Sequence, residues 1–385
     1  MALSLSRRSD RITQAEIRVM TIECEKVGGI NLAQGVCDTQ APPPVRRGAQ
    51  AAIDAGVNSY TRFDGLAELR RAIAAKLRDY NGINADPETE ITVSAGSTGA
   101  FYCACLALLD PGDEVILFEP YYGYHLNTIE AVGAAGAYVR TNPPDWTFDP
   151  HELERAITPR TKGIMVNTPA NPSGKVFTRE EMEVIGEAAR RHDLFIFTDE
   201  IYEHFVYDGR QHISPASLPG LADRTITISG FSKSYSITGW RVGYSAAEQR
   251  WAEVIGQMND LVYVCAPAPL QAGVARGVGG LDRSYYERLL AEYGGKRERI
   301  CRALEAAGLP PSVPQGAYYV LADVSRLPGT TGKDRAMFLL RETGVAGVPG
   351  EAFYHDGAGD SLIRFCFAKA DAELDEACRR LARLR

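Results

Sequence analysis

The pattern of apolar and polar residues along the middle of the chain predicts short buried strands separated by helices. Apolar runs too short to be helices occupy residues 91–93, 114–117, 162–166, 194–197 and 225–228. Apolar residues recur at helical spacing over residues 67–77, 96–109 and 178–191. Strands that are apolar on both faces and alternate with helices are typical of a mostly parallel sheet covered by helices on both sides.

The two ends of the chain follow a different pattern. Residues 12–27 predict a short helix or arm, a strand follows at 30–33, and a proline-rich turn is expected at 42–44. From about residue 281, long helical stretches accompany strands, which are expected at 318–322 and 362–367. These segments indicate a second unit that combines helices and strands without strict alternation.

The length of 385 residues is compatible with about two domains, since a domain has roughly 150 residues. We predict an α/β fold in which residues 46–280 form a large domain. Its mostly parallel sheet, of seven-stranded type, would be sandwiched by helices. Residues 1–45 together with residues 281–385 would form a smaller α+β domain.

Composition narrows the class of protein. With 45% hydrophobic residues, 24% charged residues and a net charge of −7, the chain resembles an ordinary globular protein and has no basic excess for nucleic acid or an acidic membrane. No apolar run approaches the ~20 residues of a membrane span, and the N-terminus becomes polar too early for a signal peptide. The eight cysteines and six histidines show no metal-binding spacing. We therefore expect a cytoplasmic protein without a metal site.

Four polar segments directly follow predicted strands, at residues 94–99, 167–174, 198–202 and 229–233. Taken singly, each has an ordinary explanation as a turn, a helix cap or a pair of surface cations. The carboxyl ends of parallel strands, however, lie at one edge of a sheet, where ligands bind. The four segments together therefore predict a single site.

The residue types in these segments suggest its chemistry. Lys233 lies on a turn of small residues, eight positions before Arg241, so an amine and an anion-binding group are close in sequence. Only eight residues of the chain are lysines, and arginine cannot replace lysine as an amine nucleophile. Asp199 follows a buried strand, and Asn171 lies in a loop held by two prolines. The glycine-rich turn at 96–99 offers backbone N–H groups to a phosphate.

Three segments, NTPANPSGKVF, TDEIYEHFVYDG and GFSKSYSITGWRVGY, resemble in this order the class I/II aminotransferases, which are pyridoxal-phosphate enzymes of fold type I. The resemblance is greatest to the branch of kynurenine/glutamine and bacterial aspartate aminotransferases, and it extends from INLAQG to SLIRFCFA. It implies pyridoxal 5'-phosphate as cofactor and amino transfer between an L-amino acid and a 2-oxo acid. A carbon–sulfur β-lyase, or another lyase or oxidase using the same cofactor, stays open as an alternative. A regulator on the same scaffold would need a DNA-binding domain, for which the chain has neither spare length nor a basic segment.

The resemblance also implies roles for individual residues. Lys233 would hold the cofactor as a Schiff base and act as general base, Asp199 would keep the pyridine nitrogen protonated, and Tyr202 would bind the phenolic oxygen. Arg364 and Gly35 would bind the substrate carboxylate together with Asn171. Further cofactor contacts would come from Ser97, Thr98, Tyr122, Asn171, Ser232, Arg241 and, from the neighbouring subunit of a homodimer, Tyr60.

The chain departs from the family pattern at two positions. Gly230 stands where many relatives have a phosphate-binding serine, and the sequence does not decide whether Ser229 replaces it. Cys37 stands where many have a proline, in a loop near the substrate side chain, so the resemblance does not specify the substrate. Tyr121, Tyr122, Tyr124 and Tyr318 could line an aromatic pocket, and the sequence identifies no second arginine for a dicarboxylate.

Overall fold

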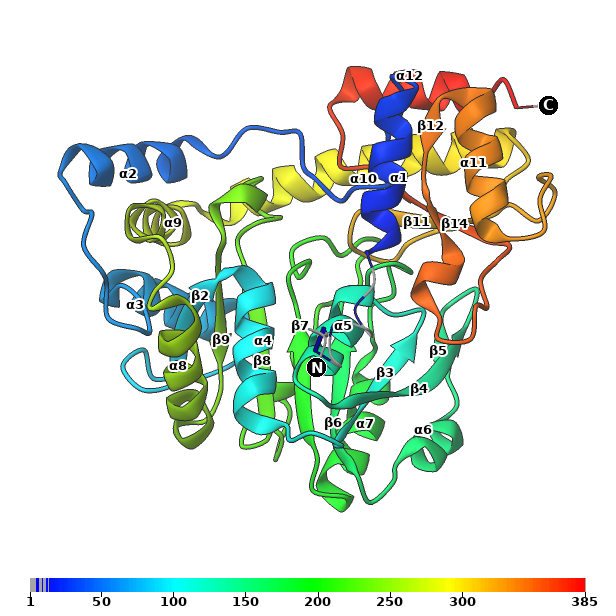
Figure 1. The fold of residues 1–385 in the computed structure, drawn as a ribbon. Helices are drawn as coiled ribbons and strands as arrows, with labels where there is room; N and C mark the ends of the chain where they lie inside the picture. Colours follow the sequence, from blue (N-terminus) through cyan, green and yellow to red (C-terminus); the bar gives the residue numbers. More distant parts are fainter. Residues whose placement is uncertain (1–4, 7–8, 10–11, 13, 385) are drawn as a thin grey trace.

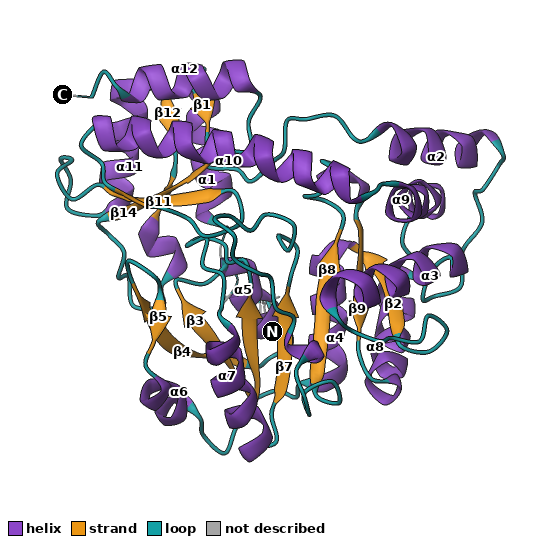
Figure 2. Ribbon diagram, turned by 180° about the vertical axis from the view of Figure 1, so that it is seen from behind, coloured by secondary structure: helices purple, strands orange, loops and turns teal. Residues whose placement is uncertain are grey.

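The computed structural model describes residues 5–6, 9, 12 and 14–384. Its largest sheet has eight strands (Figures 1 and 2). Their order across the sheet is β2 (Ile91–Ala95), β9 (Val242–Ala246), β8 (Thr225–Gly230), β7 (Phe195–Asp199), β6 (Thr161–Asn167), β3 (Glu114–Glu119), β4 (Ala135–Asn142) and β5 (Thr147–Phe148). The strands from β8 to β4 are parallel, while β9 runs antiparallel to both of its neighbours. The predicted α/β class and mostly parallel sheet are confirmed, with the two-residue β5 added to a seven-stranded core.

Alternate residues of the central strands enter different cores on the two faces of this sheet. In β3, Val115 and Leu117 pack with helices α4 (Gly96–Leu108), α5 (Gly123–Ala131) and α8 (Gln249–Tyr263). Ile116 and Phe118 pack with α6 (Pro150–Ala156) and α7 (Arg179–Arg191) on the opposite face. Burial of both faces explains why these strands are continuous apolar runs in the sequence.

A third core lies at the β2–β9 end of the sheet. It is formed with α3 (Ala67–Lys76) and α9 (Ala268–Gly280), and α2 (Pro43–Asp54) packs against α9. Figure 1 shows α2 and α9 together at one side of the molecule. A short π-helix, η1 (Leu77–Asn81), continues α3, and 3-10 turns occur at η2 (Pro215–Ser217), η3 (Thr238–Trp240) and η4 (Gly350–Phe353).

The two ends of the chain share a separate core. Met20 and Cys24 of α1 (Glu16–Lys26) are buried with residues of α10 (Arg283–Ala306), α11 (Gly332–Thr343) and α12 (Asp371–Leu381), and Figure 1 shows α1 beside α11 and α12. An antiparallel sheet here has the order β10 (Pro311–Ser312), β11 (Tyr319–Asp323), β14 (Leu362–Cys366) and β13 (Val348–Pro349). A parallel pair joins β1 (Ile30–Asn31) to β12 (Val345–Ala346). We propose that this core marks the smaller domain; the boundaries at 46 and 280 stay a prediction.

Some local expectations are corrected. The proline-rich segment at 42–44 is not simply a turn, because Pro43 and Pro44 begin α2, where a missing N–H removes no helical bond. The arm predicted from residue 12 is helical only from Glu16 onward among the described residues, and residue 13 lies outside them. No helix within the described part of the chain is long and apolar enough to cross a membrane.

Candidate active site

A cavity of about 500 Å³ lies at the carboxyl ends of β6, β7 and β8. In the register of the sheet, Asn167 is level with Asp199, and Asp199 with Ile228, so the polar segments that follow these strands meet at one edge. Every predicted site residue except Tyr60 lines this cavity, namely Gly35, Ser97, Thr98, Tyr122, Asn171, Asp199, Tyr202, Ser232, Lys233, Arg241 and Arg364. The structure thus brings together predicted residues up to 329 positions apart, from Gly35 to Arg364.

The amine of Lys233 lies within this cavity. Its Nζ donates a hydrogen bond to the carbonyl oxygen of Gly35 at 3.1 Å and lies 5.8 Å from the ring centre of Tyr202. Burial lowers the pKa of the Lys233 ammonium below its usual range, and the positive charge of Arg241 acts in the same direction. A lowered pKa increases the fraction of neutral amine, which is the nucleophilic and proton-accepting form.

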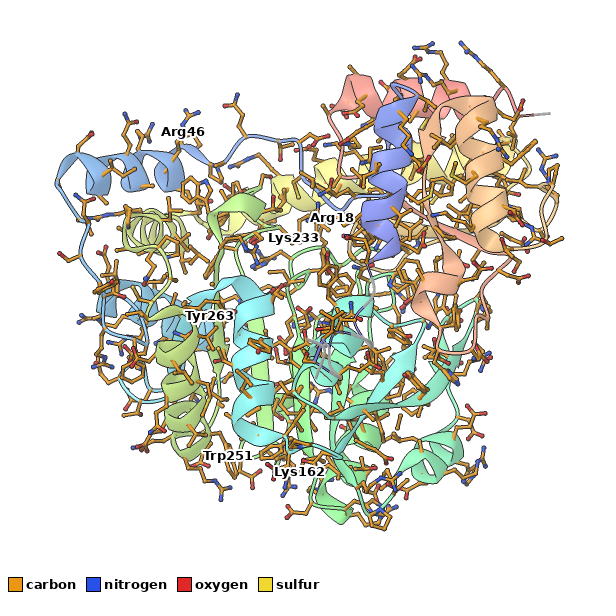
Figure 3. All side chains as sticks on the ribbon, viewed as in Figure 1. Arg18, Arg46, Lys162, Lys233, Trp251 and Tyr263 are labelled. Atoms are coloured by element: carbon orange, nitrogen blue, oxygen red, sulfur yellow. The ribbon has the colours of Figure 1, made fainter. Side chains whose placement is uncertain are left out.

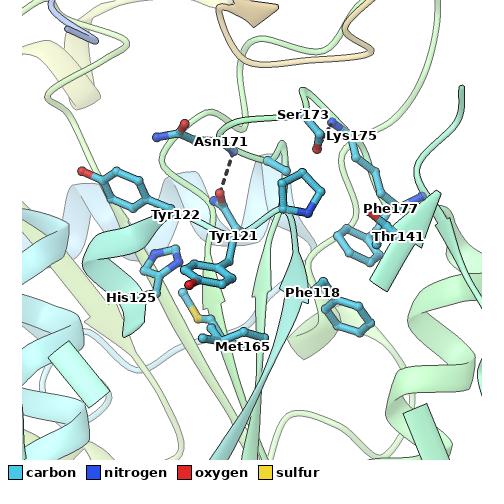
Figure 4. A pocket seen from close by; sticks show the side chains of 14 residues that line it. Phe118, Tyr121, Tyr122, His125, Thr141, Met165, Asn171, Ser173, Lys175 and Phe177 are labelled. Atoms are coloured by element: carbon cyan, nitrogen blue, oxygen red, sulfur yellow. Dashed lines mark hydrogen bonds between the residues drawn. The ribbon is translucent and has the colours of Figure 1, made fainter. Parts of the chain in front are cut away.

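Asp199 is held at the end of β7 by a partner that the sequence did not predict. Its Oδ2 lies 2.9 Å from Nε2 of His125, and its Oδ1 accepts a hydrogen bond from the backbone N–H of Ile201 at 3.2 Å. Asp199 and His125 are both buried. Figure 4 shows His125 below the ring of Tyr122 in a small pocket next to the cavity. The carboxylate is therefore fixed in direction before any ligand binds.

One end of the cavity is built to bind an anion. Ser97 and Thr98 lie in the first turn of α4, which begins at Gly96. A Cβ at Gly96 would lie 2.5 Å from a guanidinium nitrogen of Arg241, so glycine permits this close approach. Arg241 donates only to the carbonyl oxygens of Thr238 and Ala95, and among the described residues it has no carboxylate partner. A helix N-terminus with an uncompensated guanidinium is a favourable phosphate site.

A second guanidinium, that of Arg364, also lines the cavity. Arg364 of β14 is fully buried, donates to Oδ1 of Asn171 at 2.7 Å, and lies 4.3 Å from the ring centre of Tyr319. Its Nε has no hydrogen-bond partner among the described residues. A buried N–H without a partner costs free energy unless a ligand accepts its hydrogen bond, so this side chain is prepared for a carboxylate.

Close packing also shapes the cavity lining at Gly35. A Cβ at Gly35 would lie 1.9 Å from the hydroxyl oxygen of Tyr319, which excludes any larger residue at that position. The Tyr319 hydroxyl is 2.9 Å from the hydroxyl of Tyr202. Burial raises the pKa values of Tyr202, Tyr319 and Tyr122, so all three hydroxyls stay protonated and can donate hydrogen bonds.

The structure shows where Ser229, Gly230 and Tyr60 lie relative to the cavity. Ser229 does not line the cavity: its hydroxyl donates to Oε1 of Glu203 at 3.0 Å on the other side of the strand. Gly230 packs tightly, since a Cβ there would lie 3.1 Å from Cα of Gly243. Tyr60 is 82% exposed and does not line the cavity of its own chain.

Three further residues that line the cavity were not predicted from the sequence, namely His125, Tyr319 and Arg18. His125 lies on α5, six positions after Glu119 at the end of β3, and no motif marks it. Tyr319 follows the predicted aromatic residue Tyr318 by one position, and the hydroxyls of both tyrosines lie near Gly35. Arg18 lies on α1, far along the sequence from the strand-end segments.

Known proteins resemble this chain over nearly its whole length. The family model described as aminotransferase class I and II matches residues 27–381. A probable N-succinyldiaminopimelate aminotransferase DapC of Mycobacterium tuberculosis is 36% identical over 94% of both chains. Kynurenine–oxoglutarate transaminase 3 of Rattus norvegicus is 35% identical over 90% of this chain and 83% of its own. The solved N-succinyldiaminopimelate aminotransferase from Mycobacterium tuberculosis superposes with a TM-score of 0.96 at 34% identity, covering 99% of this chain and 100% of that one.

Proposed function

Because this chain belongs to the class I and II aminotransferases, we propose that its transaminase reaction depends on pyridoxal 5'-phosphate bound in the cavity through Lys233. The reaction transfers an amino group between an amino acid and a 2-oxo acid. One observation carries the proposal: a lysine amine of lowered pKa, a fixed carboxylate and two guanidinium groups converge on one cavity.

The residues present fit this cofactor group by group. The start of α4 and Arg241 suit a phosphate, since this end has positive charge and free N–H groups. Asp199 suits a protonated ring nitrogen, because a carboxylate within hydrogen-bond range stabilises that proton. The hydroxyl of Tyr202 and the amide of Asn171 suit the ring oxygen, and the ring of Tyr122 suits stacking. Ser97, Thr98 and Ser232 provide hydroxyls at the same cavity wall.

The chain's own groups would perform the remaining steps. When bound, the cofactor supplies an electron sink for the bond broken at the substrate Cα. Nζ of Lys233, set free when the substrate amine takes its place, would take the proton from the substrate Cα and pass it to the cofactor carbon that receives the amino group, as its lowered pKa permits. Arg364 binds the substrate carboxylate in a planar fork that lysine could not provide, with Gly35 and Asn171 beside it.

We further propose that the active unit is a homodimer in the cytoplasm. Tyr60 is highly exposed in the single chain, and its exposure suits a hydroxyl that reaches the phosphate site of a neighbouring subunit. All eight cysteines are free thiols, which suits a reducing compartment. Light scattering would give a dimer mass, and cell fractionation would place the chain in the cytoplasmic fraction; a monomer or a secreted chain would contradict these proposals.

A screen of amino donors tests the proposed function. The holoenzyme is mixed with single amino acids, with and without a 2-oxo acid acceptor, and the visible absorbance of the cofactor and the released oxo acid are recorded. We expect a donor to change the absorbance and release one equivalent of oxo acid, with continued turnover only when an acceptor is present. Release of pyruvate and ammonia from cystathionine without an acceptor would instead identify a β-lyase.

A further inference from the structure

A buried glutamate links the large sheet to the part of the chain that precedes Arg364. Glu119 ends β3 and is 1% exposed. Its Oε1 accepts a hydrogen bond from the backbone N–H of His355 at 2.7 Å and lies 2.9 Å from Nδ1 of the same residue. Its Oε2 accepts a hydrogen bond from Arg140 of β4 at 3.0 Å. Because His355 lies in the connection between β13 and β14, this carboxylate joins two sheets that share no strand (Figure 1).

Two further contacts fasten the same segment, residues 353–356, to the large sheet. The backbone N–H of Tyr121 donates a hydrogen bond to the carbonyl oxygen of Phe353 at 3.0 Å. The ring of His355 stacks on that of Tyr138 in β4, with 4.2 Å between the ring centres and 5° between the planes. The position of this segment is therefore fixed by β3 and β4 and by the residues that follow β3.

The 353–356 segment supports the guanidinium of Arg364. Phe353 is 1% exposed, and its ring centre lies 5.2 Å from the guanidinium carbon of Arg364. The ring of Tyr319 lies 4.3 Å from the same carbon. Aromatic rings within about 6 Å attract and orient a guanidinium group. Phe353 thus forms part of the wall against which Arg364 rests.

Glu119 acts at a distance from the cavity. Neither this residue nor the 353–356 segment lines the cavity. A buried carboxylate is costly unless it is hydrogen-bonded, and the hydrogen bonds to both oxygens of Glu119 satisfy this requirement. Lys233 lies at the junction of the large sheet and the unit formed by the chain ends (Figure 3), and its amine bonds to Gly35. The network of Glu119 therefore reaches Arg364 but not Lys233.

We propose that Glu119 is a positioning residue for the site of the substrate's α-carboxylate. Through the 353–356 segment it holds the ring of Phe353 against the guanidinium of Arg364. This inference rests on the proposed function, in which Arg364 binds that carboxylate. Because the carboxylate is bound both before and during the reaction, loss of its support should raise KM and leave kcat nearly the same.

The test uses Glu119→Gln with the amino donor that reacts best in the wild type and with the amine that lacks only its α-carboxylate. The KM of the donor should rise roughly tenfold, while kcat changes by less than about threefold. The single-turnover rate with the amine should stay the same, because this compound has no group for Arg364. Calorimetric binding of hexanoate should weaken, whereas binding of hexanamide and the visible absorbance of the cofactor should not change.

Three further variants serve as controls. Glu114→Gln removes the carboxylate at the opposite end of β3, which pairs with Arg160 outside the cavity, and should leave KM and hexanoate binding unchanged. In an Arg364→Lys background, Glu119→Gln should have little further effect on KM, because the supported guanidinium is gone. His355→Ala, at a side chain that is 42% exposed, should raise KM by a smaller factor and provides the measurement if Glu119→Gln does not fold.

The outcomes separate this inference from the proposed function. An unchanged KM and unchanged hexanoate binding in the folded variants of Glu119 and His355 would overturn the positioning role. Equal losses with the donor and with the amine that lacks its carboxylate would also overturn it. Failure of the wild-type holoenzyme to yield an oxo acid from any amino donor would instead overturn the proposed function.

Discussion

Two neighbouring carboxylates at the end of β7 lie in regions with opposite electrostatics. Asp199 lines the cavity, where Lys233 and three arginines have no carboxylate partner of their own among the described residues. Glu200 is fully buried and accepts hydrogen bonds from His212 at 2.8 Å and from Ser214. One peptide bond thus separates a region with more cationic than anionic side chains from a region in which both carboxylates have donors from the protein.

The matched region is a buried network behind the cavity. Glu203 forms an ion pair with Lys76 and accepts hydrogen bonds from Asn81 at 2.9 Å and Ser229 at 3.0 Å. Glu200, Glu203 and His212 are close enough together to hold a metal ion, but Lys76 already supplies positive charge to Glu203. Buried charges that are matched by the protein fix the local structure, whereas unmatched cations in a cavity attract anionic ligands. Substitutions should therefore cost activity on one side of β7 and stability on the other.

The largest effect on activity is expected for Lys233→Ala. Loss of the general base alone should lower turnover by roughly 10²–10⁴-fold, and loss of covalent cofactor binding adds to this. The urea midpoint of the apoprotein should stay the same or rise, because a partly desolvated amine is removed. Steady-state kinetics and urea unfolding test both parts. Lys162→Ala, which removes an exposed lysine of β6, should leave both values unchanged; a Lys233→Ala variant with normal turnover would contradict the assignment.

For Lys76→Met in the network, we expect a loss of stability with little loss of activity. Although burial raises the pKa of Glu203, Lys76, His204 and His212 together outweigh this effect, and the pKa falls from 4.5 to about 2. Losing the contribution of Lys76 to that shift should lower the free energy of unfolding at pH 7 by at most about 3 kcal/mol. Turnover per folded molecule should change by less than about threefold. Urea unfolding with a matched activity assay measures both, and the double variant Lys76→Met/Glu203→Gln should recover part of the stability.

The loss of unfolding free energy in Lys76→Met should become smaller as the pH falls. A carboxyl group whose pKa is lower in the folded than in the unfolded protein stabilises the fold at pH values above its unfolded pKa. The contribution of Glu203 is thus complete above about 4.5 and disappears as the pH falls toward 2. The difference in unfolding free energy between wild type and Lys76→Met should accordingly shrink between pH 5 and pH 3. A difference that is constant over this range would show that the ion pair is not its source.

The cavity could be predicted from the sequence to a greater extent than the network. Lys233, Asp199 and Asn171 each follow a strand, and the parallel arrangement brings the strand ends together, so their meeting needed no tertiary detail. His125 had no such signal, because only the packing of α5 against the end of β7 brings it to Asp199. The direction of Ser229 could have been inferred, since successive side chains of a strand point to opposite faces.

The residues of the buried network lie in segments whose pairing could not be predicted from the sequence. Glu203 and His212 lie in loops after β7, and Lys76 lies on α3, more than one hundred residues earlier. Their pairing depends on how α3 packs at the β2–β9 end of the sheet, which no local pattern specifies. The same holds for Arg18, whose approach to the cavity follows from the packing of α1 on the C-terminal helices. Long-range packing of this kind is decided by the whole core.

The sharpest comparison is between the two histidines that pair with these adjacent carboxylates. Nε2 of His125 lies 2.9 Å from a carboxylate oxygen of Asp199, and Nε2 of His212 lies 2.8 Å from one of Glu200. His212→Leu leaves the fully buried Glu200 short of a donor and should cost about 1–3 kcal/mol of stability with little effect on turnover. His125→Leu leaves Asp199 beside an open cavity, where solvent can replace the lost partner, so stability should change less. Its kcat/KM should fall about tenfold, because Asp199 is no longer held in direction, and His125→Gln should restore part of it. Equal losses of activity in the two leucine variants would show that the network, too, supports the chemistry directly.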